Sequence, residues 1–290
     1  MDVRSVFVAG AGAMGNGIAQ VCAQSGISVI MMDINEEILK KAMGTVRWSV
    51  SKFAEKGKIA EDVQTVMDRI KTATDFSACA DVDMVIEAVF EKLEIKHETF
   101  KKVDAAAGPN TLLASNTSAI PITQLASVLS RPENFIGLHF FNPVPMMQAV
   151  EVIRGAATSD QAFADGIAFV QAIGKEPIRV NRDIPGFLLN RTNMMSNIEA
   201  MRLVEQGVAT PEDIDKGMRL AFGRKMGPFE TADLTGLDVQ CMAYMNMYEE
   251  EKDLRFYPPF ILRRKVLAGH LGRKVGKGWY EYNPDGSRKQ

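Results

Sequence analysis

Residues 3–23 read VRSVFVAGAGAMGNGIAQVCA, and this stretch decides the fold. A run of β-prone residues ends at a glycine-rich turn, and apolar residues then recur at helical spacing. A GxGxxG turn between a strand and a helix is typical of a dinucleotide-binding βαβ unit. Gly10 permits the tight turn, Gly12 lets the backbone approach a pyrophosphate, and Gly15 lets the helix pack close to the strand. The alternative is a glycine turn with a purely structural purpose.

The next strand predicts which dinucleotide binds. Apolar residues 27–32 end at Asp33, which follows Gly15 by 18 residues, near the place where an acid holds the adenosine ribose 2′-hydroxyl. Ile34-Asn35-Glu36 then offers no Arg for a 2′-phosphate, so we predict NAD rather than NADP. Ala13 and Met14 begin the helix, whose free N–H groups would meet the phosphates.

Composition excludes several classes of protein. The 290 residues are 46% hydrophobic and 24% charged, with a net charge of −2, which favours neither a nucleic-acid partner nor a membrane. The three cysteines lack CxxC spacing, so we expect no disulfide framework, no metal site and a reducing, cytoplasmic compartment. We also expect no signal peptide, and no apolar run reaches the ~18 residues of a membrane span.

Strands and helices alternate over the first part of the chain. Strands are expected at residues 84–88, 111–115, 135–141, 149–153 and 177–180, with helices over residues 92–107 and 159–173. This order predicts an α/β fold with a doubly wound, largely parallel Rossmann-type sheet in a domain of residues 1–184. Helices over residues 36–55 and 61–71 form an inserted hairpin, whose lysines at the tip either stay in water or contact a phosphate.

The composition changes at Asp183-Ile184-Pro185-Gly186. Beyond this point helical periodicity replaces the β-prone runs, over residues 187–206, 211–221, 227–235 and 239–251. We therefore predict an all-α C-terminal domain of residues 185–290.

His139 is the candidate general base among three histidines. Hydride transfer to a nicotinamide requires one proton to move, and His is the side chain that titrates near neutral pH. His97 lies on a charged helix and His270 in a tail loop, whereas His139 ends an apolar strand. Ligands of this fold bind at the carboxyl ends of strands, so catalysis is preferred over a buried structural histidine.

Glu151 is the predicted partner of His139. It interrupts the apolar run Ala149-Val150-Glu151-Val152-Ile153, and a buried carboxylate requires a partner. Paired with His139, it would fix the imidazole tautomer and orient the ring. The alternative places Glu151 in water on a half-exposed edge strand.

Short polar side chains complete the candidate site. Ser118 ends the cluster Ser115-Asn116-Thr117-Ser118 and is either a site residue or a helix cap. Asn190 shares one helix face with Asn193 and Asn197, and this stripe faces either a crevice between the domains or water.

Six stretches together carry a family resemblance: GAGAMGNGIAQ at residue 10, ASNTSAI at 114, GLHFFNPVPMMQAVEVIRG at 137, PGFLLNR at 185, MGPFETADLTGLD at 226 and LGRKVGKGWYEY at 271. They extend over nearly the whole chain. The sequence resembles the L-3-hydroxyacyl-CoA dehydrogenases, most closely the short bacterial enzymes that act on 3-hydroxybutyryl-CoA. The resemblance implies an NAD-dependent oxidoreductase, an acyl-CoA substrate and a homodimer formed through the helical domain.

The resemblance also implies residue roles. His139 would be the general base and Glu151 its orienting partner, while Ser118 and Asn190 would hold the 3-oxygen of the substrate. Further cofactor contacts are expected at Glu91, Lys96, Asn116, Ser118 and Asn142. Ser51, Lys52 and Lys56 are candidates for CoA contacts, because the family's own residues on the hairpin do not align securely here. Ala119 stands where many members have a second Ser, which leaves the matched role of Ser118 intact.

Three other functions compete with this interpretation. Related β-hydroxyacid dehydrogenases use a Lys early in the first interdomain helix, where this chain has Asn190 and Arg191. A dehydrogenase of a free sugar acid on the same scaffold is nearer in sequence. A non-catalytic NAD-binding or structural protein, as among lens crystallins, would not need the set of polar residues above.

Overall fold

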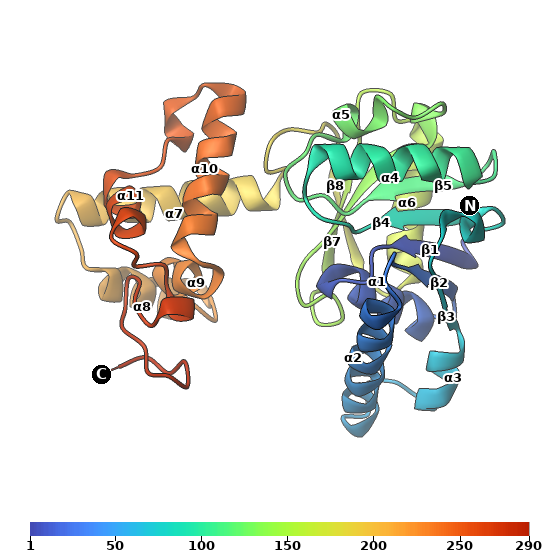
Figure 1. The fold of residues 1–290 in the computed structure, drawn as a ribbon. Helices are drawn as coiled ribbons and strands as arrows, with labels where there is room; N and C mark the ends of the chain where they lie inside the picture. Colours follow the sequence, from blue (N-terminus) through green and yellow to red (C-terminus); the bar gives the residue numbers. More distant parts are fainter. Residues whose placement is uncertain (290) are drawn as a thin grey trace. The chain divides into compact units, whose positions relative to one another are not determined.

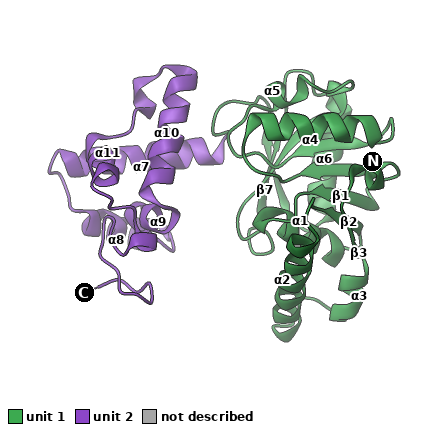
Figure 2. Cartoon of the chain, in the orientation of Figure 1, with its two compact units in different colours: residues 1–187 green, residues 188–290 purple. Residues whose placement is uncertain are grey.

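The computed structural model describes residues 1–289 and divides into two compact units, Met1–Phe187 and Leu188–Gln290 (Figure 2). The first unit is an α/β sandwich and the second is helical (Figure 1). The expected fold class, an α/β domain followed by an all-α domain, is therefore confirmed.

The first unit contains one eight-stranded sheet in the order β3-β2-β1-β4-β5-β6-β7-β8. Every neighbouring pair is parallel except β6 and β7, which are antiparallel. The strands are β1 Ser5–Ala9, β2 Ser28–Met32, β3 Ile70–Ala73, β4 Met84–Glu87, β5 Leu112–Ser115, β6 Phe135–Phe140, β7 Ala149–Ile153 and β8 Glu176–Val180.

Helices cover both faces of this sheet (Figure 1). Val6 and Val8 of β1 belong to one hydrophobic core, and Phe7 and Ala9 to the other, because successive side chains of a strand point to opposite faces. Burial on both faces explains why the strands read as continuous apolar runs. The helices are α1 Ala13–Gln24, α2 Glu36–Glu55, α3 Val63–Asp68, α4 Leu93–Ala106, α5 Ile122–Ala126 and α6 Asp160–Ala172.

The glycine turn between β1 and α1 has little room for side chains. Gly10 has a φ of 104°, and a Cβ there would lie 2.6 Å from the carbonyl oxygen of Ala88. A Cβ on Gly15 would lie 1.8 Å from the carbonyl oxygen of Gly10. A larger residue at position 15 would push α1 away from the turn, and one at position 10 would clash with the chain that follows β4.

One predicted helix is too long. The helix expected over residues 61–71 ends at Asp68 as α3, and residues 70–73 form the edge strand β3. Ile70 to Ala73 pair in parallel with Val29 to Met32 of β2. These sheet hydrogen bonds outweigh the local helical pattern, and sequence periodicity does not contain them.

The second unit packs five helices around its own core. They are α7 Leu189–Glu205, α8 Pro211–Phe222, α9 Pro228–Thr235, α10 Leu237–Glu251 and α11 Phe260–Leu267, the last of which the periodicity did not predict. The C-terminal segment is anchored by Asp233, which accepts hydrogen bonds from the backbone N–H of Trp279 and Tyr280 and from the Tyr282 hydroxyl. Ile198, Phe229 and Tyr244 are fully buried in this core.

Candidate functional site

The two residues predicted to act together, His139 and Glu151, lie directly opposite each other on β6 and β7. The Nδ1 atom of His139 lies 2.6 Å from Oε2 of Glu151, and the two side chains are 4% and 0% exposed. Because β7 lies between β6 and β8, the alternative of a half-exposed edge strand is wrong. Glu151 engages Nδ1, and the opposite nitrogen Nε2 is therefore the atom suited to exchanging a proton with a substrate.

Neighbouring groups fix the position of this pair. The Oδ1 atom of Asn116, at the end of β5, accepts a hydrogen bond of 2.9 Å from the backbone N–H of Phe140. The rings of Phe141 and Phe187 lie 4.5 and 5.8 Å from the imidazole, measured between centroids. Asn116 thus ties the end of β5 to the strand of His139, at the carboxyl ends of both strands.

Ser118 lies in an exposed turn that Glu91 organises. One carboxylate oxygen of Glu91 accepts hydrogen bonds from the Thr117 hydroxyl, from the Ser118 N–H at 2.8 Å and from the Ala119 N–H at 3.1 Å. The helix cap of α5 is Pro121, so the interpretation of Ser118 as a helix cap is wrong. The turn leaves Ser118 exposed to solvent.

Lys96 lies buried between two carboxylates. Its Nζ atom is 2.6 Å from Oε1 of Glu87 and 3.1 Å from Oε2 of Glu91, and its side chain is 1% exposed. Burial raises the pKa of Glu91, but the charge of Lys96 and the hydrogen bonds from Thr117 and Ser118 outweigh it and hold this pKa below its usual value. Lys96 therefore stabilises the ionised form of the residue that organises the Ser118 turn.

Sequence reasoning missed the role of Glu87, which is fully buried at the end of β4. Its carboxylate also accepts hydrogen bonds from the Ser115 hydroxyl at 2.6 Å and the Val89 N–H at 2.7 Å. A signal was present, because Glu87 ends an apolar strand in the same way that Glu151 interrupts one.

The glycine turn fits a dinucleotide phosphate. Gly12 is the N-cap of α1 and makes no side-chain cap, and a Cβ built on it would meet nothing within 4 Å. Ala13 and Met14 form the start of α1, and the helix dipole favours an anion next to their N–H groups. Asp33 lies beside the turn, because its Oδ2 accepts a hydrogen bond of 3.0 Å from the Ala11 N–H.

A cavity of about 370 Å³ adjoins the carboxyl ends of β2 and β3. Residues from the start of α2 and from the end of β3 line it: Glu36, Leu39, Lys40, Met43, Thr72, Ala73 and Thr74. Its place at the carboxyl end of the strand next to Asp33 suits the adenosine half of a dinucleotide.

The remaining predicted residues lie outside this cluster. Asn142 is exposed in the segment that follows β6, and Ser51, Lys52 and Lys56 are at the end of α2. Lys52 forms an exposed ion pair with Glu55 at 2.7 Å.

The polar stripe of α7 is not one exposed face. Asn193 is exposed while Asn197 is buried, and the nearby Asn190 is half-buried in the second unit.

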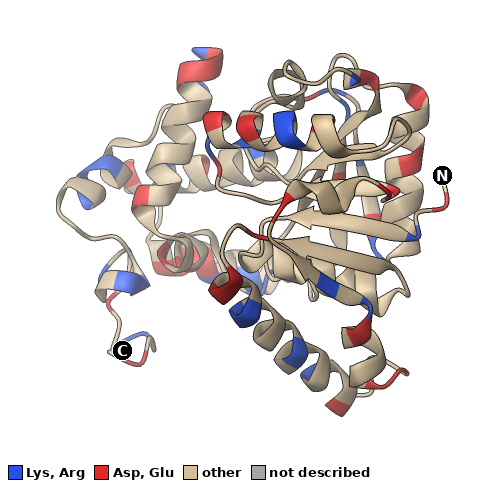
Figure 3. Ribbon diagram, turned by 45° about the vertical axis from the view of Figure 1, so that its right-hand side comes forward, with Lys and Arg blue, Asp and Glu red and all other residues tan. Residues whose placement is uncertain are grey.

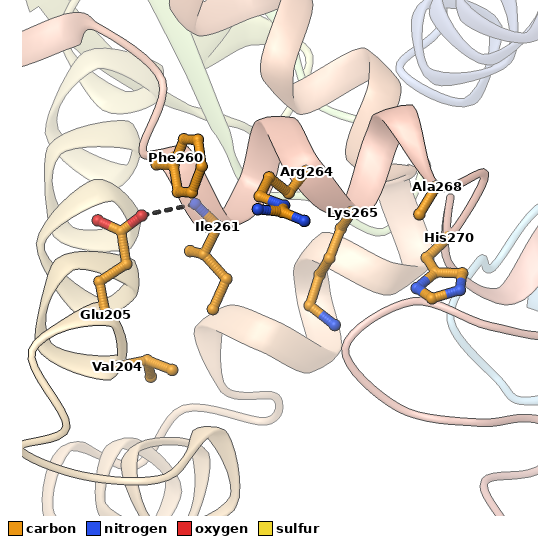
Figure 4. A pocket seen from close by; sticks show the side chains of 8 residues that line it. All are labelled: Val204, Glu205, Phe260, Ile261, Arg264, Lys265, Ala268 and His270. Atoms are coloured by element: carbon orange, nitrogen blue, oxygen red, sulfur yellow. Dashed lines mark hydrogen bonds between the residues drawn. The ribbon is translucent and has the colours of Figure 1, made fainter.

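A larger cavity, of about 810 Å³, lies in the second unit between α7 and α11 (Figure 4). His270 is among its lining residues, but none of the predicted site residues is. Over residues 1–289, no cluster of three or more His, Cys, Asp or Glu side chains could hold a metal ion. No helix in this range is both long and apolar enough to cross a membrane.

The sheet, the glycine turn and the acid at the end of β2 define an NAD-binding protein. Residues 5–184 match the family described as 3-hydroxyacyl-CoA dehydrogenase, NAD binding domain, and residues 186–282 match its C-terminal domain. The chain therefore belongs to the 3-hydroxyacyl-CoA dehydrogenase family, whose members are NAD-dependent oxidoreductases. The family predicted from the sequence motifs is confirmed.

Similar proteins match this chain over nearly its full length. A Deinococcus radiodurans protein named "Probable 3-hydroxybutyryl-CoA dehydrogenase" is 46% identical over 95% of this chain and 99% of its own. The human mitochondrial hydroxyacyl-coenzyme A dehydrogenase is 40% identical, over 97% and 91% of the two chains. The crystal structure of (S)-3-hydroxybutyryl-CoA dehydrogenase from Ralstonia eutropha superposes with a TM-score of 0.93 at 42% identity, covering 97% and 100%.

Proposed function

We propose that this chain interconverts (S)-3-hydroxybutyryl-CoA and acetoacetyl-CoA, with His139 as the general acid and base. The observation that carries the proposal is the buried 2.6 Å contact between His139 and Glu151 at the carboxyl end of β6. The names of the relatives in Deinococcus radiodurans and Ralstonia eutropha support the short acyl chain.

Residues of this chain can move the proton and stabilise the charges that form in the reaction. In oxidation, Nε2 of His139 takes the proton of the 3-hydroxyl group while the hydride leaves C3. Glu151 stabilises the imidazolium that forms, because a carboxylate on Nδ1 favours the charged ring. Ser118 and Asn190 donate hydrogen bonds to the 3-oxygen, where negative charge develops. NAD, when bound, supplies the hydride acceptor, and the reduction runs the same steps in reverse.

We assign cofactor contacts to the turn residues Gly10, Gly12, Ala13, Met14 and Gly15, which fit a pyrophosphate by the space above Gly12. Asp33 would hold the adenosine ribose beside the 370 Å³ cavity. The nicotinamide half would lie against residues around the Ser118 turn and the end of β6: Glu91, Lys96, Asn116, Ser118 and Asn142.

We assign CoA contacts to Ser51, Lys52 and Lys56 at the end of α2. This long helix carries Lys and Arg residues between acidic residues at its two ends (Figure 3), and these cations would attract the phosphates of CoA.

We also propose that residues 1–184 bind the cofactor, while residues 185–290 complete the substrate site and form a homodimer. The separate family matches to residues 5–184 and 186–282 support this division. The buried free thiols of Cys22 and Cys79 suit a reducing compartment such as the cytoplasm.

The test is consumption of NADH with acetoacetyl-CoA, measured beside NADPH with the same ester and NADH with free acetoacetate or L-gulonate. We expect fast turnover with NADH and the CoA ester alone. Turnover of only the free acids would replace this proposal with a sugar-acid or hydroxyacid dehydrogenase. Tight NADH binding without any turnover would favour a non-catalytic NAD-binding protein.

A further inference from the structure

Lys175 is a buried cation that the reaction described above does not use. It lies between α6 and β8 and is 6% exposed. Its Nζ atom donates hydrogen bonds to two backbone carbonyl oxygens, that of Val144 at 2.9 Å and that of Met147 at 2.6 Å. Burial lowers the pKa of Lys175, since these partners are neutral dipoles. An ammonium kept in such a place is costly and calls for an explanation.

The carbonyl groups that Lys175 binds belong to residues 142–148, a segment within the connection of residues 141–148 between β6 and β7. His139 lies before this segment and Glu151 lies after it. Within the segment, the N–H groups of Met146 and Met147 both donate to the Pro143 carbonyl oxygen, at 2.9 and 3.1 Å. The segment is therefore a compact turn whose outward carbonyl groups point to Lys175, and its first residue is Asn142.

The opposite side of the segment packs on α1, the helix that follows the glycine turn. A Cβ built on Gly17 would lie 2.8 Å from Cβ of Val144, so Val144 leaves no room for a side chain at position 17. Lys175 and α1 thus hold the segment from two sides.

We propose that Lys175 is a positioning residue, which fixes residues 142–148 against α1 and so sets His139 and Asn142 relative to the bound nicotinamide. The inference rests on the function proposed above. A lysine suits this place because its long apolar stem crosses the core and its ammonium carries enough donors for two carbonyl groups at once. Glu151 orients the imidazole ring, whereas Lys175 fixes the backbone that joins the two strands.

The experiment compares Lys175→Met, which keeps the stem and removes the ammonium, with Lys175→Arg, which keeps the charge and several donors. Hydrogen exchange of residues 143–148 reports the segment directly, and steady-state kinetics with NADH and acetoacetyl-CoA report its effect. We expect faster exchange in this segment of Lys175→Met. We also expect kcat to fall on the order of 10²-fold, the cost of a small misplacement of reacting groups. Both KM values should change much less than kcat, and Lys175→Arg should restore most of the rate.

A folded Lys175→Met variant with wild-type exchange in residues 143–148, or with wild-type kcat, would overturn the proposal. If that variant does not fold, Gly17→Ala displaces Val144 from the other side and leaves the ammonium in place. It should give the same loss in kcat, and wild-type kinetics there would also overturn the proposal. A wild-type enzyme that turns over no acyl-CoA would refute the proposed function instead, while the exchange data would still decide whether Lys175 holds the segment.

Discussion

Replacing Glu151 by Gln keeps almost the same side-chain volume but removes the negative charge beside His139. The Glu151 carboxylate is fully buried and lies 2.6 Å from Nδ1 of His139. A charge-assisted hydrogen bond of this kind contributes about 1.5–3 kcal/mol. The amide of Gln carries no charge, so it does not stabilise the imidazolium that forms when Nε2 takes the hydroxyl proton of the substrate. Where its N–H₂ group faces Nδ1, the proton of the neutral imidazole stays on Nε2, and that tautomer cannot accept the hydroxyl proton.

We therefore expect Glu151→Gln to lower kcat by on the order of 10²–10⁴, the usual worth of a general base. The assay is oxidation of (S)-3-hydroxybutyryl-CoA with saturating NAD, beside thermal unfolding to confirm that the variant is folded. Glu98→Gln is the matched control, because Glu98 is exposed on α4 and its carboxylate forms a solvent-accessible ion pair with Lys102, at 2.8 Å. A folded Glu151→Gln variant that keeps a kcat close to that of the control would refute the reasoning.

Three further predictions concern the cofactor site and stability. Gly12→Ala should leave thermal unfolding almost unchanged but weaken NADH binding at least about tenfold in a fluorescence titration, since its methyl group would occupy the space for the pyrophosphate. The control is Gly44→Ala on α2, where a methyl group also points to open space, and this variant should bind NADH normally. Asp233→Asn should lower the free energy of unfolding in urea by about 2–3 kcal/mol, whereas Tyr282→Phe should lower it by about 1 kcal/mol. Equal losses in the two variants would contradict the anchoring role of the Asp233 carboxylate. The folded pKa of Glu91 lies below its ordinary value of 4.5, so its carboxylate stabilises the fold above pH 4.5, and this contribution disappears as the pH falls through the lower folded pKa. Glu91→Gln should therefore flatten the acid side of the plot of unfolding free energy against pH, and an unchanged slope would show that Glu91 is not linked to folding.

The first βαβ unit could be predicted from the sequence because its determinants are local. Gly10 is required by its positive φ and Gly15 by its contact with the Gly10 carbonyl group, and the apolar strands are continuous because both of their faces are buried. The pairing of His139 with Glu151 could also be predicted, since a carboxylate inside an apolar strand has few possible partners.

Features that depend on distant contacts could not be predicted in this way. Residues 70–73 continue a helical pattern, and only their pairing with β2 makes them a strand. Lys96 occurs on a helix rich in charged residues, and this pattern does not indicate that its side chain is buried and paired with Glu87 and Glu91. Lys175 follows a helix-ending glycine and looks like a surface residue until the carbonyl groups of Val144 and Met147 are placed beside it.

The central claim is that His139 transfers the proton of the reaction, and one measurement tests it most directly. It is the turnover of acetoacetyl-CoA by His139→Gln at saturating NADH, in a variant shown to be folded and to bind NADH as the wild type does. The account predicts a loss in kcat on the order of 10²–10⁴. Turnover near that of the wild type would show that another group moves the proton.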